Sequence, residues 1–335
     1  MKILFIGPKK GNSYLHFLAL KRTYKKVDII NSEDVFVFPF VSKKIFYHIS
    51  PYIFQFYINY FILSKIHNNY DLIYVRSGEI IGKNLLLKLK KKAKKIVYFC
   101  NDNPFVKRDN KRWKLFLDAA KYYDKIAFQD KARLKPSKKW GIKKPLLVLP
   151  PYDKKIHKRH EISSNEKKKF KNDLVFIGTW SPNKGLFLKK IIELGIDVKI
   201  YGNRWDKDPN FEYIKHKVIL GNVLNPNYSK IIQSSKIALC LFSEENLDTI
   251  TARSIEIPAI GTLLFSLRTE SMKEIFVENK EAIFFKTPKE CVKKIKYYLK
   301  NNKISKKIAK KANFKITKIL RPTHEELIKK ILLNL

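Results

Sequence analysis

Short apolar runs recur along the sequence with room for one helix between each pair, and this repetition constrains the fold most. Most of the runs are continuously apolar, which is typical of strands buried on both faces of a parallel sheet. Helical patterns lie between them, for example at 82–95 and 108–123. The repetition predicts a doubly wound α/β domain. In the first half the expected strands are 3–6, 27–30, 72–75, 96–100, 125–128 and 146–149.

The second half restarts the same pattern after an interruption. Pro150, Pro151 and the polar stretch 157–172 carry no periodic apolar signal, so 157–172 is expected to be a linker. Beyond it, strands are expected at 174–178, 198–202, 218–221, 237–242, 262–266 and 282–285, with helices at 184–194, 228–234, 251–260, 271–276 and 288–301.

This organisation predicts two Rossmann-like domains, 1–156 and 173–302, followed by a helical tail, 303–335, that is broken at Pro322. Two such domains would face each other across a cleft at the carboxyl ends of their strands, where open α/β folds bind ligands. Dehydrogenases, sugar-nucleotide epimerases, transferases and two-domain binding proteins all share this architecture, so the function has to be inferred from the site.

Composition leaves two explanations of the charge open. The chain has 335 residues, 45% of them hydrophobic, which suffices for two cores. Its 70 Lys and Arg against 30 Asp and Glu give a net charge of +40. That excess indicates a polyanionic partner, either nucleic acid or an acidic membrane surface, or else a genome rich in A and T, whose codons favour Lys, Ile, Asn, Phe and Tyr.

The three cysteines lie far apart, and an odd number cannot form a closed disulfide framework. We therefore expect a reducing compartment and no structural metal. The first apolar run is too short for a signal peptide. A cytoplasmic protein is expected, with peripheral attachment to the inner face of the cell membrane left open.

Residues 45–65 form a long, strongly apolar stretch. It contains Pro51 and Asn59 and four tyrosines, which a membrane-spanning helix would tolerate poorly. The first interpretation is a buried crossover helix ahead of the next strand. The second is an aromatic surface that enters a membrane interface, with Lys43 and Lys44 on anionic headgroups.

The segment 176–205 reads FIGTWSPNKGLFLKKIIELGIDVKIYGNRW. An expected strand ends at Gly178, which lets a ligand approach the backbone closely. Lys184 then lies at the start of a helix, where its charge adds to the partial positive charge of the helix end. This combination suits a diphosphate, although a turn glycine with a surface lysine explains the spacing equally well.

The segment 243–266 carries a second polar constellation. Asp248 follows an apolar strand, and the hydroxyls of Thr249 and Thr251 are placed to cap the next helix or to face an anion. Arg253 and Glu256 are three residues apart and share one helix face. A surface ion pair between these two is the alternative explanation.

The runs FIGTWSPNKG, YGNRW, DTITARSIEIPAIGTLLFS and EAIFF resemble the CgeB-like, spore-maturation type glycosyltransferases, which are related to the retaining family 4. The resemblance covers about half of the chain, 174–301. It implies the GT-B fold and transfer of a sugar from a nucleotide-diphosphate donor to a glycan, lipid-linked or protein acceptor. The donor domain would then be 173–302 and the acceptor-side domain 1–156.

The resemblance also implies roles for individual residues. Family 4 holds its donor with a Glu-x7-Glu motif, and Asp248 and Glu256 have this spacing, with the first carboxylate one methylene shorter. Where the family's diphosphate element has an arginine this chain has Thr179, so Arg253 or Arg204 would have to supply the guanidinium. The expected donor-binding set is Gly178, Thr179, Lys184, Gly202, Asn203, Arg204, Thr249, Thr251, Arg253 and Glu256.

Retention through an oxocarbenium-like ion pair needs little from a protein base, which agrees with the lack of an obvious nucleophile. Catalysis is assigned to Asp248 and Glu256. No metal is expected, and no cofactor other than the donor. On the acceptor side, Asp102 follows a predicted strand of the first domain; a carboxylate that only stabilises a turn is the alternative. His16 is expected to pack rather than to react.

Two other functions stay open. A GT-B-shaped epimerase would consume the donor without an acceptor, and a non-catalytic basic protein would bind a membrane or nucleic acid with steep salt dependence. Nucleic acid is not the expected partner, because no RNA-binding motif is present.

Overall fold

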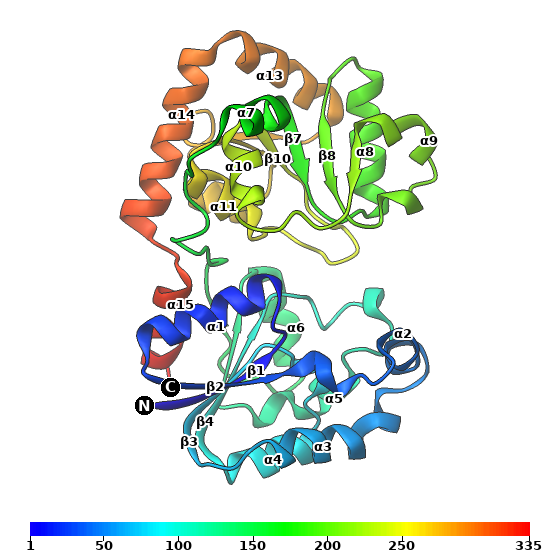
Figure 1. Ribbon diagram of the computed structural model, residues 1–335, viewed down its shortest axis with the longest axis vertical. Helices are drawn as coiled ribbons and strands as arrows, with labels where there is room; N and C mark the ends of the chain where they lie inside the picture. Colours follow the sequence, from blue (N-terminus) through cyan, green and yellow to red (C-terminus); the bar gives the residue numbers. More distant parts are fainter. The chain divides into compact units, whose positions relative to one another are not determined.

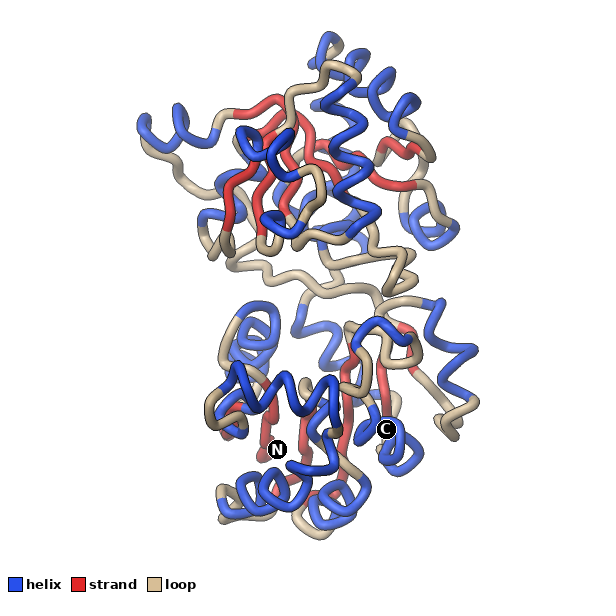
Figure 2. The backbone as a smooth tube through the Cα atoms, turned by 90° about the vertical axis from the view of Figure 1, so that its right-hand side faces the viewer, coloured by secondary structure: helices blue, strands red, loops and turns tan.

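The computed structural model describes residues 1–335 and divides into two compact units. The first comprises Met1–Leu149, Glu245–Leu247 and His324–Leu335, and the second comprises Pro150–Glu244 and Asp248–Thr323. Each unit is an α/β sandwich with helices on both faces of one sheet (Figures 1 and 2). The fold class predicted from the sequence is therefore confirmed.

The first sheet has the order β2-β1-β3-β4-β5-β6, and every pair is parallel. Its strands are β1 (Lys2–Gly7), β2 (Lys26–Asn31), β3 (Tyr70–Val75), β4 (Ala93–Cys100), β5 (Lys125–Phe128) and β6 (Leu146–Leu147). Its helices are α1 (Gly11–Thr23), α2 (Pro39–Lys44), α3 (Gln55–Ser64), α4 (Lys83–Lys90), α5 (Lys114–Ala119), α6 (Leu134–Lys138) and α15 (His324–Leu333).

Alternate residues of β1 enter two different cores. Ile3 and Phe5 pack in the core that α1 and α15 cover, whereas Leu4 and Ile6 pack in the core on the opposite face. All four side chains are at most 1% exposed. This burial on both faces explains why the strand reads as a continuous apolar run.

The second sheet has the order β12-β11-β10-β7-β8-β9, again all parallel. Its strands are β7 (Asn172–Ile177), β8 (Lys199–Gly202), β9 (Val218–Leu220), β10 (Ser235–Cys240), β11 (Leu263–Leu267) and β12 (Ile283–Phe285). Its helices are α7 (Ser164–Phe170), α8 (Pro182–Glu193), α9 (Phe211–Ile214), α10 (Asn227–Gln233), α11 (Arg253–Ile260), α12 (Glu270–Ile275), α13 (Pro288–Lys300) and α14 (Asn302–Phe314).

All twelve strands lie where the apolar runs predicted them, but the division of the chain differs from the predicted 157–172 linker and 303–335 tail. Residues 157–172 belong to the second unit and contain α7. A reciprocal capping box between Ser163 and Glu166 starts that helix. The tail is shared, because α14 packs on α11 in the second unit and α15 packs on α1 in the first. The predicted helix 82–95 ends early, since β4 already begins at Ala93.

The apolar stretch 45–65 is a chain of three short elements, not one buried helix. One turn of π-helix (η2, Ile45–Ile49) and a 3-10 turn (η3, Pro51–Phe54) precede α3. Ser50 is extended and Pro51 starts η3, which breaks the helical path. Phe46 is fully buried, but Phe56 is 87% exposed. The expectation of a buried crossover helix is thus only half right. No helix combines the length and apolarity needed to cross a bilayer.

Candidate functional site

The order of the second sheet places a topological switch point between β7 and β10. From β7 the chain continues outward through β8 and β9, and from β10 it continues outward on the other side through β11 and β12. Open α/β sheets bind ligands at the carboxyl ends of the two strands that flank such a point. The residues after β7 and β10, with the helices α8 and α11 that follow, are therefore the first candidates for a site.

Two glycines allow close backbone contact beside this point. Gly178 follows β7, and its N–H donates to the carbonyl of Tyr201 at 2.8 Å. Gly202 ends β8 with φ +149°, and a Cβ there would lie 2.1 Å from the Gly178 carbonyl oxygen. That oxygen also accepts from Nε1 of the buried Trp205, at 2.9 Å. Only glycine fits at position 202, because the neighbouring atom is backbone.

The start of α8 is fixed against the end of β10. Asn183 Nδ2 donates to the Phe242 carbonyl at 2.9 Å. Lys184 lies in the first turn, half-buried, and its Nζ donates to the Thr179 carbonyl at 3.3 Å. The lysine charge therefore lies beside the β7–α8 turn and adds to the positive helix end.

Packing requires a glycine at position 185. A Cβ on this residue would lie 1.9 Å from Oδ2 of Asp208, which accepts from the indole N–H of Trp180 at 2.7 Å.

Arg253 links α11 to the end of β7. Its Nε donates to the carbonyl of Ile177, the residue before Gly178. Burial alone would lower the pKa of Arg253, but Tyr228 and Glu256 outweigh it, and the net shift is upward. The guanidinium therefore stays charged at the switch point, next to the glycine turn.

Glu256 is inside the second unit, only 3% exposed. Its Oε2 accepts from the hydroxyl of Tyr228 at 2.8 Å, and its Oε1 lies 3.8 Å from Nε2 of the buried His157. Nδ1 of His157 accepts from the Asp153 N–H at 3.0 Å, so Nε2 is the ring nitrogen that faces Glu256. Burial, and then the Glu256 carboxylate, raise the pKa of Tyr228 well above its usual value. The alternative of a surface Arg253–Glu256 pair is wrong.

The sequence did not point to Tyr228 or His157 as partners of Glu256. Tyr228 was only one residue of a predicted helix, and His157 was assigned to the linker. Both reach Glu256 through tertiary packing, for which the linear spacing holds no signal.

The remaining residues of the 243–266 segment have separate partners. α11 begins at Arg253, so neither Thr249 nor Thr251 caps it, contrary to one expectation. Thr249 Oγ1 lies 2.7 Å from Ser271 Oγ, and Thr251 Oγ1 lies 3.5 Å from the sulfur of the buried Cys240. Asp248 is half-buried, and its N–H donates to the Ser243 carbonyl at 3.1 Å. Its catalytic role stays a prediction.

The GNRW turn after β8 presents two further predicted residues. The Asn203 carbonyl accepts from the Trp180 N–H at 3.0 Å. Arg204 has φ +65°, is exposed and forms no ion pair. Of the two arginines considered as replacements for the family's arginine, Arg253 is therefore held at the end of β7, whereas Arg204 extends into solvent.

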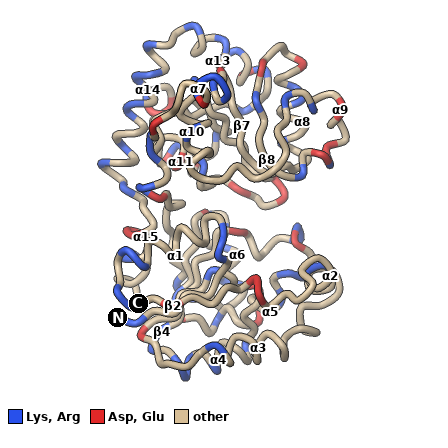
Figure 3. Tube along the Cα trace, viewed as in Figure 1, with Lys and Arg blue, Asp and Glu red and all other residues tan.

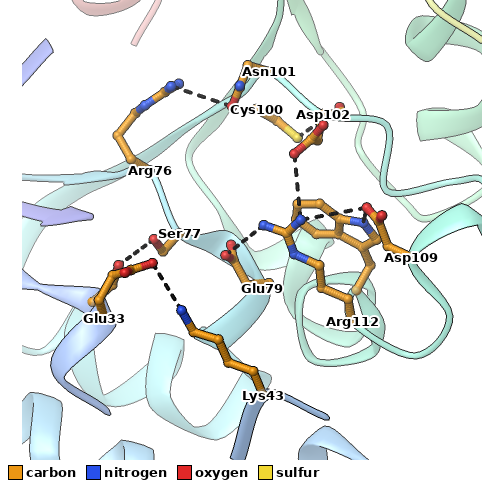
Figure 4. Close-up of polar contacts among 12 residues, drawn as sticks. Glu33, Lys43, Arg76, Ser77, Glu79, Cys100, Asn101, Asp102, Asp109 and Arg112 are labelled. Atoms are coloured by element: carbon orange, nitrogen blue, oxygen red, sulfur yellow. Dashed lines mark hydrogen bonds and ion pairs between the residues drawn. The ribbon is translucent and has the colours of Figure 1, made fainter. Parts of the chain in front are cut away.

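Asp102 belongs to a polar cluster at the carboxyl ends of the first sheet (Figure 4). One carboxylate oxygen lies 3.3 Å from Arg108 and the other 3.7 Å from Arg112. Arg112 also pairs with Glu79 at 3.0 Å, and Arg108 pairs with Asp109 at 2.9 Å. Asp102 is thus an ion-paired carboxylate after β4, and its part in acceptor binding remains a prediction.

The switch point of the first sheet lies elsewhere, between β1 and β3. Gly7 ends β1, and a Cβ on it would lie 2.7 Å from Cβ of Arg76, which follows β3. Arg76 donates to the Phe99 carbonyl at 2.9 Å. His16 is fully buried among Tyr74, Phe99 and His324, and burial lowers its pKa well below the usual value. It packs in the core, as the sequence predicted.

Comparison with known proteins agrees with this fold. Residues 184–330 match the family model described as Glycosyl transferase-like, and no curated protein matches the sequence. The fold is similar to HepE from Anabaena in complex with UDP-glucose, with TM-score 0.68 and 12% identity over 100% of both chains.

Two synthases of phosphorylated disaccharides are similar as well. Sucrose-phosphate synthase from Thermosynechococcus elongatus has TM-score 0.70 and 11% identity over 100% of this chain and 99% of that one. A UDP-forming trehalose-phosphate synthase from Burkholderia xenovorans has TM-score 0.65 and 12% identity over 100% and 98%. These likenesses establish the GT-B type of fold and, with the family match, support glycosyltransferase activity.

Proposed function

We propose that this chain is a glycosyltransferase that binds a nucleotide-diphosphate sugar at the switch point of its second sheet. One observation carries the proposal: α8 and α11 both begin beside the carboxyl ends of β7 and β10, and each brings a cation there, Lys184 and Arg253. Helix ends with added cations favour a diphosphate.

The proposed chemistry follows from where charge develops. When the glycosidic bond to the donor breaks, negative charge accumulates on the departing diphosphate. Cations fixed in advance at that position stabilise the transition state more than the ground state. Lys184 and Arg253 would supply this stabilisation from the protein itself, which favours transfer without a metal. The family resemblance favours retention of the anomeric configuration, with Asp248 addressing the sugar.

Glu256 is proposed to accept from the ribose hydroxyls of the donor. The hydroxyl of Tyr228 holds one of its oxygens by a hydrogen bond, and His157 packs beside the other, at 3.8 Å. That HepE is similar in fold and was crystallised with UDP-glucose favours a uridine nucleotide. The resemblance to CgeB-like enzymes favours a glycan, lipid-linked or protein acceptor, with Asp102 on the acceptor side.

Titration calorimetry with UDP and 2′-deoxy-UDP tests the donor site directly. If Glu256 binds the ribose, the wild type should prefer UDP by about tenfold, roughly one good hydrogen bond to a charged group. Glu256→Ala should lose this preference. Tyr228→Phe is the matched control, because it removes a hydroxyl from the same pocket and leaves the carboxylate. An unchanged preference in Glu256→Ala would contradict the ribose assignment.

Product analysis with the donor alone then separates the transferase from a GT-B-shaped epimerase. A transferase without acceptor should release free sugar and nucleotide slowly, whereas an epimerase should produce an isomeric sugar nucleotide. The isomer would overturn the proposed reaction.

A further inference from the structure

The first unit exposes a cluster of large apolar side chains around α2 and α3. We refer to them as the aromatic face: Phe38, Phe40, Val41, Ile53, Phe56 and Tyr60. Phe38, Phe40 and Phe56 are 79, 85 and 87% exposed. In Figure 1 the helices α2 and α3 lie at the outer margin of the first unit. Soluble monomers rarely leave so many neighbouring apolar side chains in water, so such a patch indicates a binding surface.

The inner side of this segment already has a core partner. Ile58 and Ile62 of α3 are at most 1% exposed and pack in the first unit. Phe56 and Tyr60 of the same helix are 87 and 68% exposed, so α3 carries large apolar side chains on its outer side as well as its inner side, with Gln55 and Asn59 as polar positions between them. An amphipathic helix would carry polar residues at those outer positions, so the exposed rings indicate a second apolar environment.

The aromatic face is also firmly attached. The buried ring of Phe46 lies beneath the segment, with its centroid 5.4 Å from that of Phe36, which precedes α2, and 6.3 Å from that of Phe54, which precedes α3. Lys111 donates to the carbonyls of Tyr47 and Ile49, from its N–H at 2.9 Å and from Nζ at 2.8 Å. The exposed rings are thus presented on a braced segment.

The segment that carries the aromatic face contributes charge of one sign. Between Val35 and Tyr70 the sequence contains no Asp or Glu, and Figure 3 shows no red on α2 or α3. Two carboxylates reach it from outside the segment: Glu33 lies on Lys43, at 3.3 Å, and Asp118 accepts from the hydroxyl of Tyr52 at 2.6 Å. Lys44 and Lys65, at the ends of the two helices, are exposed and form no ion pair.

We propose that the aromatic face docks this protein on an anionic lipid bilayer. Phe and Tyr side chains are favourable at the depth of the headgroups, and lysines beside them attract acidic lipids. A second copy of the chain is a poorer occupant. A two-fold contact would bring Lys44 and Lys65 close to their own copies, and the segment 36–69 supplies no carboxylate to pair with them. This docking does not depend on the transferase assignment.

Vesicle flotation of the full chain tests the proposal, using phosphatidylcholine vesicles with and without phosphatidylglycerol. The wild type should float with the anionic vesicles and much less with the neutral ones. Phe40→Ser combined with Phe56→Ser should weaken partitioning by at least about tenfold, because two interfacial rings are lost. Lys44→Gln with Lys65→Gln should weaken it several-fold and reduce its salt dependence.

Leu333→Ser is the matched control, since Leu333 is 87% exposed on α15 of the same unit and lies outside the aromatic face. It should float like the wild type. Thermal unfolding and UDP affinity should be the same in all variants, which keeps docking separate from folding and from the donor site. Wild-type flotation in the double Phe variant would overturn the proposal, and so would equal binding to neutral vesicles. A wild-type dimer that the double Phe variant dissociates, without vesicle binding, would overturn it in favour of a protein interface.

Discussion

The arginines after β4 and the arginine that begins α11 lie at the same kind of sheet edge but are held by different partners. At the first edge, Arg108 and Arg112 are neutralised by carboxylates of their own unit, Asp102, Asp109 and Glu79. At the second edge, Arg253 donates to a backbone carbonyl, and no carboxylate lies within ion-pair distance.

The partners of an arginine indicate whether its charge serves the stability of the protein or the binding of an anion. An arginine that is already matched by carboxylates stabilises the protein itself, and removing it leaves buried negative charge. An arginine without a carboxylate partner retains its charge for an anion from outside. Arg112 and Arg253 therefore predict opposite consequences of substitution, and the experiments below test this contrast.

The largest effect is expected at Arg253. Arg253→Lys keeps one positive charge but loses the planar fork, and kcat/KM with the sugar nucleotide should fall by about 100-fold. Arg204→Ala should change kcat/KM only a few-fold, because that side chain is exposed and unsupported. Steady-state kinetics of both variants checks the assignment. The reverse order would make Arg204 the diphosphate ligand.

At the first edge, Arg112→Met should lower the free energy of unfolding by about 3 kcal/mol, because it leaves carboxylates that are largely shielded from water without their positively charged partner. The pKa of Arg112 reflects the same partners: burial would lower it, but Glu79 and Asp102 raise it strongly. Urea denaturation measures the loss. UDP affinity, measured in the folded protein, should not change; a loss of UDP binding with intact stability would break the contrast.

A smaller effect is expected from the glycine that ends β8. Gly202→Ala should destabilise the protein by about 2 kcal/mol more than Gly221→Ala. Both positions have positive φ, 149° and 108°, but only the Cβ at 202 would meet backbone, the Gly178 carbonyl oxygen. Thermal unfolding of the two variants gives the difference. Equal losses would mean that the φ angle, and not the strand contact, sets the requirement.

The smallest effect concerns a surface network of the second unit. Burial raises the pKa of Glu290, but its bonds from Lys294 and from the Lys286 N–H, together with Arg268, lower it to about 2 from an ordinary 4.5. The stabilisation is therefore present above about pH 4.5 and is lost as the pH falls toward 2.

Because 30% of the Glu290 side chain is exposed, Glu290→Gln should cost only about 1 kcal/mol at pH 7. It should also flatten the decline of stability between pH 4.5 and 2, followed by urea denaturation across that range. An unchanged acid slope would show that the network contributes nothing.

The sequence predicted the strands well because a strand buried on both faces is visible without any tertiary information. β1 and β7 illustrate this: Gly7 ends the apolar run of β1, and Gly178 follows that of β7. Once these strands were recognised as parallel, the polar residues after β7 and β10 could be assigned to one edge of the sheet, because parallel strands bring their carboxyl ends together.

What the sequence could not supply were contacts between distant segments. The hydroxyl of Tyr228 on Glu256 depends on how α10 packs against α11. α7 is different, because Ser163 and Glu166 have capping-box spacing in the sequence, and that signal could have identified the helix. For 45–65 the sequence left a buried helix and an exposed aromatic surface both open, because composition cannot say which way an apolar residue points.

The return of α15 to the first unit has a consequence for biosynthesis. Leu327, Ile328 and Ile331 cover one face of the first sheet, yet a ribosome reaches them only after it has made the whole second unit. During translation, the side chains of Ile3, Phe5 and Leu72 therefore lack their apolar contacts with α15 until α15 has been synthesised. The nascent first unit is thus the stage at which this chain would most need a chaperone.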